Sequence, residues 1–235
     1  MDPAVLAVLG LAVVGAVAVL GWRMEQKRRE RVLAFALGRA WLYEADDPSL
    51  VDAFTGEPFG EGDDRRARTV LRGREVGREF VAFDYSYETH TNTSKGRSTT
   101  THRFAVCVVP LPVPLGVVEV RPEGLVSRAA DAMGVSGDLE LESEDFNRRF
   151  RVRARNAKLA SDVLTPRTMQ YLVGQPREVV PAFRISGGHL VAWRTGRLDP
   201  AEVVTTCAVL DRVLDGIPSF VWRDAGGSGG YDPGP

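Results

Sequence analysis

The sequence predicts an α+β protein: an N-terminal transmembrane helix followed by one cytoplasmic domain, with antiparallel sheet hairpins and helices packed on one face. Two observations lead to this prediction. Residues 4–21 form an apolar run without a charged side chain, and from Ala67 onward apolar residues recur with a period of two. The expected parts are a transmembrane helix at 4–22, a basic juxtamembrane amphipathic helix at 23–43, an acidic linker at 44–64, an α+β domain at 65–222 and a disordered tail at 223–235.

The apolar run contains only Ala, Val, Leu and Gly, and as a helix it extends roughly 27 Å, close to the ~30 Å core of a bilayer. Cations follow the run, so the positive-inside bias predicts a single-pass protein of the cell membrane with its N-terminus outside. A removed secretory segment or a buried core helix are the alternatives. Ala12 and Ala16 have a spacing that lets two anchors form a homo-oligomer, although Ala-rich helices show it by chance. The expected anchoring residues are Ala4, Leu11, Leu20, Trp22, Arg23, Lys27, Arg28, Arg29 and Arg31.

The two segments after the anchor have opposite charge. Residues 23–43 carry six cations against two acids and an apolar stripe, so this helix lies either on anionic headgroups or on the domain. Residues 44–64 carry eight acids and no Lys or Arg, which predicts a largely irregular linker. Leu50, Phe54 and Phe59 within it suggest some docking.

Overall composition restricts the partners. The net charge of −1 gives no basic field for nucleic acid, so no nucleic-acid partner is expected. Cys107 and Cys207 each fall in an apolar pattern, which favours reduced, buried thiols and agrees with the cytoplasm.

The first part of the domain reads as an antiparallel ladder. A polar loop at His90–Ser98 joins two of the strands, and Pro110, Pro112 and Pro114 are expected to end the ladder because proline donates no hydrogen bond. A helix is expected to begin at Pro122 and to end at Gly134. The predicted strands are Thr69–Arg74, Arg78–Glu88, Thr99–Val109 and Gly116–Arg121.

A charged hairpin is expected next. Acids alternate with leucines over residues 138–142, and arginines alternate with apolar residues over 149–153. An antiparallel register that sets Glu142 opposite Arg149 also sets Glu140 opposite Arg151 and Asp138 opposite Arg153, which favours a solvated salt-bridge ladder. The arginine row taken alone would be an anion or lipid site.

Local signals define the C-terminal elements. Helices are expected at Asn156–Leu164 and Pro166–Val173, with Thr165 as an N-cap. A hairpin over Pro181–Thr195 would turn at Gly187-Gly188. Asp199 and Pro200 then open a helix whose buried stripe includes Cys207.

The candidate chemistry lies in the polar loop and the strand ends beside it, over Glu88–His102. His90, Lys95, Arg97 and His102 are the candidate contacts for a partner or ligand, because loop side chains of these types are accessible and polar. A metal would need a third ligand, for which Glu88 is the obvious choice. No catalytic, cofactor-binding or metal-binding residue is assigned, and no cofactor is expected.

Four motifs carry a resemblance. They are Gly77–Tyr85, Thr101–Val106, Leu141–Arg148 and Ile217–Trp222. Through them the chain resembles a family of uncharacterised, chiefly actinobacterial, single-pass membrane-anchored proteins with a domain of unknown function. The resemblance covers nearly everything after the linker and implies no activity, so no functional residue is transferred.

The function predicted from these observations is a membrane-tethered, non-catalytic interaction or scaffold module. Its partners would be the lipid bilayer and an unknown protein. One alternative is an enzyme of unrecognised type using His90 and His102 with Asp84 or Glu88. The other is an anionic-lipid-sensing domain using the arginines at 149, 151 and 153.

Overall fold

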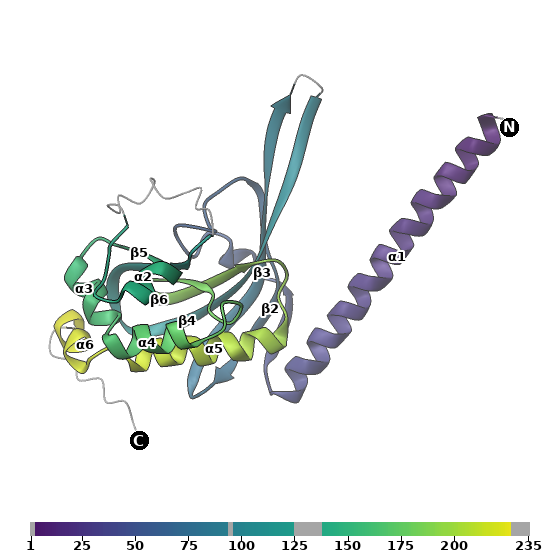
Figure 1. Cartoon of the computed structure of the whole chain (residues 1–235). Helices are drawn as coiled ribbons and strands as arrows, with labels where there is room; N and C mark the ends of the chain where they lie inside the picture. Colours follow the sequence, from purple (N-terminus) through teal and green to yellow (C-terminus); the bar gives the residue numbers. More distant parts are fainter. Residues whose placement is uncertain (1–2, 94–95, 125–137, 227–235) are drawn as a thin grey trace. The chain divides into compact units, whose positions relative to one another are not determined.

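The computed structural model describes the backbone of residues 3–93, 96–124 and 138–226. It forms two compact units that divide between Trp41 and Leu42. The first unit is one long helix, and the second contains a sheet with the remaining helices (Figure 1).

Helix α1 runs without interruption from Pro3 to Gly38, over 36 residues. The predicted transmembrane and juxtamembrane helices are thus one helix, which ends before the predicted boundary at residue 43. At its end Ala40 has a left-handed backbone, and the Trp41 N–H donates to the Ala36 carbonyl at 2.9 Å. Within the described residues, no helix has both the length and the apolar character of a bilayer crossing. The span at 4–22 stays a prediction.

The second unit is built on one antiparallel sheet of six strands, which confirms the α+β fold with an antiparallel sheet. The strands follow each other in sequence order from β1 to β5, and β6 pairs with β4. Their bounds are Leu42–Asp46 (β1), Asp63–Glu75 (β2), Arg78–Thr93 (β3), Gly96–Pro122 (β4), Phe150–Ala154 (β5) and Ala182–Thr195 (β6).

Strand β4 is 27 residues long and pairs with three other strands, β3, β5 and β6. The prediction that prolines end the ladder is therefore correct only for the pairing with β3, whose last pair is Val81 with Val108; the strand itself and its pairing with β6 continue past the prolines. The register between β4 and β6 shifts between Pro110 and Leu115, so the proline-containing stretch lies at a bulge and not in a regular ladder.

The predicted turn at Gly187-Gly188 is also wrong, because β6 is one continuous strand. Gly187 pairs with Leu115 of β4, beside the bulge, and its φ of 56° lies in the left-handed region. Glycine permits that conformation without steric strain. A glycine pair therefore has the same sequence signature in a bulge as in a hairpin turn.

The strands on either side of the predicted polar loop at His90–Ser98 extend into it. Strands β3 and β4 stay in register from the sheet out to the pair Thr93 and Gly96, and residues 94–95 lie outside the described part. Figure 1 shows these strand ends projecting beyond the rest of the sheet.

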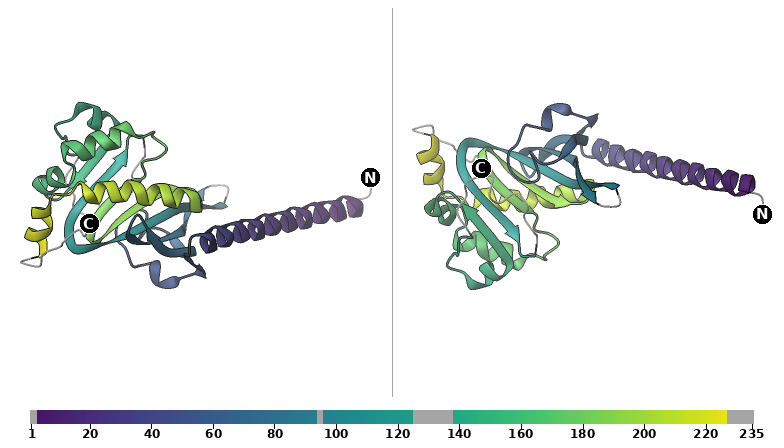
Figure 2. Two further views of the ribbon diagram at one scale, coloured as in Figure 1. Left: turned by 90° about the horizontal axis from the view of Figure 1, so that it is seen from below. Right: turned by 90° about the horizontal axis from the view of Figure 1, so that it is seen from above.

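Helix α5, Pro200–Asp215, packs against one face of the sheet and contacts β2, β3, β4 and β6 (Figure 2). Its predicted N-cap is confirmed, since the Asp199 carboxylate accepts from the Ala201 N–H at 2.9 Å. The predicted cap at Thr165 is confirmed as well, with its hydroxyl accepting from Thr168 N–H at 3.3 Å. The other helices are α2 (Glu144–Arg149), α3 (Ala157–Val163), α4 (Pro166–Gly174) and α6 (Ser219–Gly226).

The opposite face of the sheet is covered by residues 47–62, here named the cover segment. It includes the short 3-10 helix η1, Pro48–Leu50. The Phe59 ring lies 4.7 Å from that of Tyr85, and Phe54 stacks on Phe83 at 6.3 Å. The linker predicted at 44–64 is wrong at its two ends, because β1 extends to Asp46 and β2 begins at Asp63. Between them the segment is irregular apart from η1, and the expected docking is confirmed, since Leu50 and Phe59 belong to the core on the sheet and Phe54 packs against it.

Two predictions fall largely outside the described residues. The helix expected from Pro122 to Gly134 lies mostly on residues 125–137, and Pro122 itself pairs with Phe150 in the sheet. The tail predicted at 223–235 begins inside α6, and residues 227–235 are outside the described part.

Candidate functional site

A cleft of about 650 Å³ opens where α4, the end of α5 and the start of α6 meet. This volume lies within the range of sites for small ligands. Its walls come from parts of the chain that are far apart in sequence. The cleft is lined by Arg78, Pro112, Arg167, Thr168, Tyr171, Arg212, Leu214, Asp215, Gly216, Ile217, Pro218, Ser219 and Trp222.

Arg78 holds one wall of the cleft in place. It begins β3, and its guanidinium donates to Asp211 and Asp215 of α5, each at 2.6 Å. The two aspartates are one helical turn apart, so they lie on the same face of α5. Arg78 is therefore neutralised by α5 and joins that helix to the sheet.

Arg167 and Arg212 bring positive charge to the cleft, and Tyr171 lines it with them. Arg167 and Tyr171 are four residues apart on α4 and so share a helix face. The Arg212 guanidinium carbon lies 5.7 Å from the centroid of the Tyr171 ring. Burial raises the pKa of the Tyr171 phenol, and the adjacent positive charge of Arg212 opposes that shift. In the described stretches, neither Arg167 nor Arg212 forms an ion pair.

The apolar part of the lining, here named the floor, consists of Leu214, Ile217 and Trp222 with Pro112 and Pro218. The first three of these side chains are largely buried. Gly216 lies against α4, and a Cβ atom there would collide with the hydroxyl of Thr168. Only glycine therefore permits this close approach of α5 to α4.

This arrangement is suited to binding an anion with an apolar part. The lining residues include neither His nor Cys. Those residues therefore contain no side chain of the usual kind for a general base with a pKa near neutrality. Guanidinium groups beside an apolar surface are typical of sites that bind an anionic ligand.

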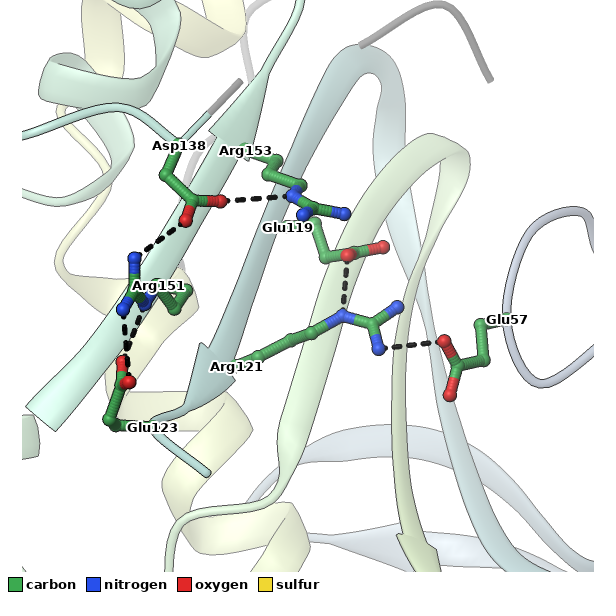
Figure 3. Close-up of polar contacts among 7 residues, drawn as sticks. All are labelled: Glu57, Glu119, Arg121, Glu123, Asp138, Arg151 and Arg153. Carbon is green, nitrogen blue, oxygen red and sulfur yellow. Dashed lines mark hydrogen bonds and ion pairs between the residues drawn. The ribbon is translucent and has the colours of Figure 1, made fainter. Parts of the chain in front are cut away.

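A second cluster of charges, here named the charge network, lies between the sheet and the cover segment. Figure 3 shows the Arg121 guanidinium between the carboxylates of Glu119, at 2.6 Å, and Glu57, at 2.7 Å. Arg184 donates to Glu119 at 3.1 Å and to the carbonyl oxygens of Glu57 and Thr55. Two cations thus face two carboxylates.

The charge network is buried, and its protonation states follow from its contacts. Arg184 is 1% exposed, and burial lowers its pKa although the charge of Glu119 opposes this. Burial alone would lower the pKa of Arg121, but its contacts with Glu119 and Glu57 raise it overall. Both guanidinium carbons lie 5.2 Å from the Trp193 ring centroid. Because the charges balance, we interpret the network as structural: it attaches the cover segment to the sheet.

The predicted salt-bridge ladder forms only in part. Asp138 pairs with Arg153 at 3.1 Å, as predicted, but it also pairs with Arg151 at 2.8 Å (Figure 3). The second partner of Arg151 is Glu123, at 2.5 Å, and not Glu140. The register with Glu142 is wrong because residues 144–149 form helix α2, for which Ser143 is the N-cap.

The three arginines at 149, 151 and 153, considered above as a lipid-sensing row, are all occupied by contacts within the protein. Arg149 donates to the carbonyl oxygens of Val173 and Gln175 at the end of α4. The other two arginines hold carboxylates, as described above. These contacts contradict the alternative of an unpaired row at 149, 151 and 153.

The histidines of the strand extension do not come together. His102 pairs with Tyr87 across the ladder and His90 with Thr99, so the two histidines are three positions apart and lie on opposite faces. His102 stacks on Tyr87 at 4.7 Å, and its Nε2 lies 2.9 Å from the Thr89 hydroxyl. The predicted approach of His90 to His102 is therefore wrong.

The remaining candidates of that region have other neighbours. Asp84 accepts a hydrogen bond from the Leu198 N–H at 2.6 Å, toward α5. Arg97 is exposed, and Lys95 lies outside the described residues. Within the described part, no group of three or more His, Cys, Asp or Glu side chains is placed to hold a metal ion. Partner contact through His90, Arg97 and His102 stays a prediction.

The predicted anchoring residues all belong to α1. Leu20 and Trp22 are strongly exposed, together with Val17 and Val19. Among the cations, Arg28 and Arg29 lie 3.7 and 3.9 Å from Glu25, and Arg31 donates to the carbonyl of Lys27 at 3.4 Å. The side chains of Ala4 and Leu11 are outside the described part.

The fold and the cleft together define an α+β protein with an antiparallel sheet and a ligand-sized site beside its helices. No family model and no curated protein matches the sequence. The solved structure of the mycobacterial trehalose monomycolate transport factor A, TtfA, is similar to this chain, with a TM-score of 0.53 and 16% sequence identity. The similarity covers 84% of this chain and 93% of that one. At this identity, it shows a shared fold.

The cleft was not predictable from the sequence. Its only local signal is the spacing of Arg167 and Tyr171 on one helix face, which any solvated helix also shows. Arg78 and Arg212 join them only through the packing of α5 on the sheet. The charge network was missed for a similar reason, because Glu119 and Arg121 have the alternation of a solvent-facing strand.

Proposed function

We propose that this protein is a membrane-tethered, non-catalytic binding module whose cleft receives its ligand or partner. The observation that carries the proposal is the cleft itself. Two guanidinium groups, those of Arg167 and Arg212, stand over an apolar floor without ion-pair partners in the described chain. Guanidinium groups bind anionic ligands, so their presence in the cleft is explained by binding without a catalysed reaction.

The tether is supported by the first part of α1. Its residues 4–21 are uncharged and apolar; among them Val17, Val19 and Leu20 are exposed, and so is Trp22 directly after the run. An apolar surface of this kind indicates an interaction with lipid or protein. The cations that follow favour a cytoplasmic position for the sheet unit. The resemblance to actinobacterial membrane-anchored proteins agrees with this proposal.

The shared fold supports a role beside a membrane transport system. The similar solved structure is described as a transport factor for trehalose monomycolate. We transfer to this chain only the general role of a non-catalytic accessory to transport.

Membrane extraction tests the tether. The full chain should stay in the pellet of carbonate-washed membranes. A double variant, Val13→Arg with Val17→Arg, should move to the supernatant, since a charge in the bilayer costs roughly 2.5–3.5 kcal/mol. Gln26→Arg, a charge in the same helix beyond the apolar run, should stay in the pellet. A wild-type chain in the supernatant would contradict the proposal, and digestion of the sheet unit by external protease would contradict its orientation.

Photocrosslinking tests the cleft. A photoreactive amino acid in place of exposed Ser219, at the cleft, should give specific adducts in intact membranes. The same group in place of exposed Arg68 on β2 serves as the control and should give none of these adducts. Identical adducts from both positions would show that the cleft is not the binding site.

A further inference from the structure

We propose that the cleft binds a phosphate ester that carries an apolar group, with the phosphate held by Arg167 and Arg212 and the apolar group on the floor. The inference rests on the proposed function and names the ligand class of the same cleft. A phospholipid headgroup and a soluble phosphate ester both supply this chemistry.

The position of the two guanidinium groups supports an anionic ligand. Arg212 lies over the Tyr171 ring, and Arg167, four residues before Tyr171 on α4, lines the same cleft. By contrast, Arg121 and Arg184 are each neutralised by carboxylates. Arg78, which lines the same cleft, is also paired with carboxylates, whereas the exposed Arg167 and Arg212 form no ion pair within the described residues and can bind an anion.

Phosphate fits this pair of cations better than carboxylate does. One guanidinium fork satisfies both oxygens of a carboxylate, whereas a phosphate ester has further oxygens and up to two charges for a second fork. Asp215 also lines the cleft, but it is bound to Arg78 at 2.6 Å, so its charge is partly neutralised. That carboxylate would still repel a ligand with several acidic groups.

The floor and the volume support an apolar group on the ligand. A bare phosphate ion would fill only a small part of about 650 Å³. Five apolar residues line the cleft, namely Pro112, Leu214, Ile217, Pro218 and Trp222. Burial of an apolar group there adds affinity that a free phosphate ion lacks.

Calorimetric titration of the full chain in a non-ionic detergent tests the ligand class. The probes are hexyl phosphate, inorganic phosphate and hexanoate. Hexyl phosphate should bind more tightly than either of the others. Arg167→Gln and Arg212→Gln should each weaken it about tenfold, as expected for the loss of a charged hydrogen bond. Arg68→Gln, the same charge change on β2, should leave the affinity within about twofold.

A second experiment, with lipid, distinguishes a phospholipid headgroup from a soluble phosphate ester as the ligand. The full chain in phosphatidylcholine nanodiscs is irradiated with photoactivatable phosphatidic acid, and adducts are mapped by mass spectrometry. Adducts within residues 166–174 or 212–222 that are lost in Arg167→Gln identify a lipid headgroup, and hexyl phosphate binding without adducts identifies a soluble ester.

Two outcomes overturn the inference. One is equal hexyl phosphate affinity in wild type and both cleft variants, and the other is hexanoate binding as tight as that of hexyl phosphate. Failure here is separable from failure of the proposed function, because membrane extraction and crosslinking from position 219 do not depend on phosphate.

Discussion

Arg184 carries a positive charge in one of the most buried positions of the sheet unit, at 1% exposure. Its guanidinium reaches one carboxylate, that of Glu119, and two backbone carbonyls of the cover segment. A buried charge is tolerated only when such partners replace water. Single residues of this kind therefore hold separate layers of the structure together.

Arg184→Met should destabilise the protein by about 3–5 kcal/mol, because it leaves Glu119 less neutralised and deprives the two carbonyls of a donor. Urea unfolding of the full chain measures this. The matched control is Arg66→Met, which breaks an exposed pair with Asp64 and should cost under about 1 kcal/mol. Equal losses in the two variants would show that the charge network contributes little.

Acid sensitivity should depend on Asp138. Burial alone would raise the pKa of this carboxyl, but hydrogen bonds from Arg153 and Arg151 outweigh burial and lower it below the usual 3.8. The pair therefore stabilises the fold above the unfolded-state pKa, and this contribution is lost as the pH falls through the folded-state value. Unfolding measured from about pH 6 to about pH 2 should show a shallower acid decline for Asp138→Asn than for wild type. Parallel declines would contradict the assignment.

For single residues, the sequence predicted those interactions whose two partners are close together in the chain. The caps at Thr165 and Asp199 were predictable because both partners lie within three residues. The cleft residues were not predictable, because Arg78 and Arg167 line one cleft only after the sheet and helices have packed.

Among the elements, the cover segment shows how far composition alone predicts packing. The eight acidic residues of 44–64 indicated a largely solvated linker with some docking, and the structure shows the docking to be firm, with Leu50 and Phe59 buried against the sheet. A few aromatic contacts outweigh a polar composition when a sheet face offers matching rings. Composition averages over a segment, whereas packing depends on the residues that face the core.

Two glycines test how closely the cover segment packs. Gly60 and Gly62 both have a positive φ, of 79° and 62°, so alanine is strained at either position by about 1–2 kcal/mol. A Cβ at position 60 meets open space, but at position 62 it would lie 2.5 Å from the Glu88 carbonyl oxygen and from the Tyr87 ring. Gly62→Ala should therefore cost roughly 1–3 kcal/mol more than Gly60→Ala in urea unfolding. Equal costs would mean that the segment moves away easily.

For the whole molecule, the class of fold was predictable and the layering was not. Alternating apolar residues indicated the antiparallel sheet, because the period of two is a property of every half-buried strand. The same pattern does not reveal which segment covers each face. Here α5 covers one face and the cover segment the other, so the sheet is buried on both sides.

The two cysteine thiols can show whether α5 and the sheet unfold together. Cys107 of β4 and Cys207 of α5 are buried, with 3.7 Å between their sulfur atoms. The hydrogen bond between them and burial both raise the pKa of Cys107 well above its usual value. A thiol reagent should label either cysteine only as fast as the whole unit unfolds, and urea should accelerate labelling at both sites equally. Rapid labelling of the native protein would show that α5 opens independently.

Strand β4 is shared by three neighbours, and this limits how the chain can change length. An inserted or deleted residue at Cys107 would shift the pairing with β3 and β6 at once, and would turn every later side chain to the wrong face. The stretch between Pro110 and Leu115 is different, because it already carries surplus residues relative to its partner strand. Variation in chain length among related proteins should therefore concentrate there, while the flanking halves of the strand keep their spacing.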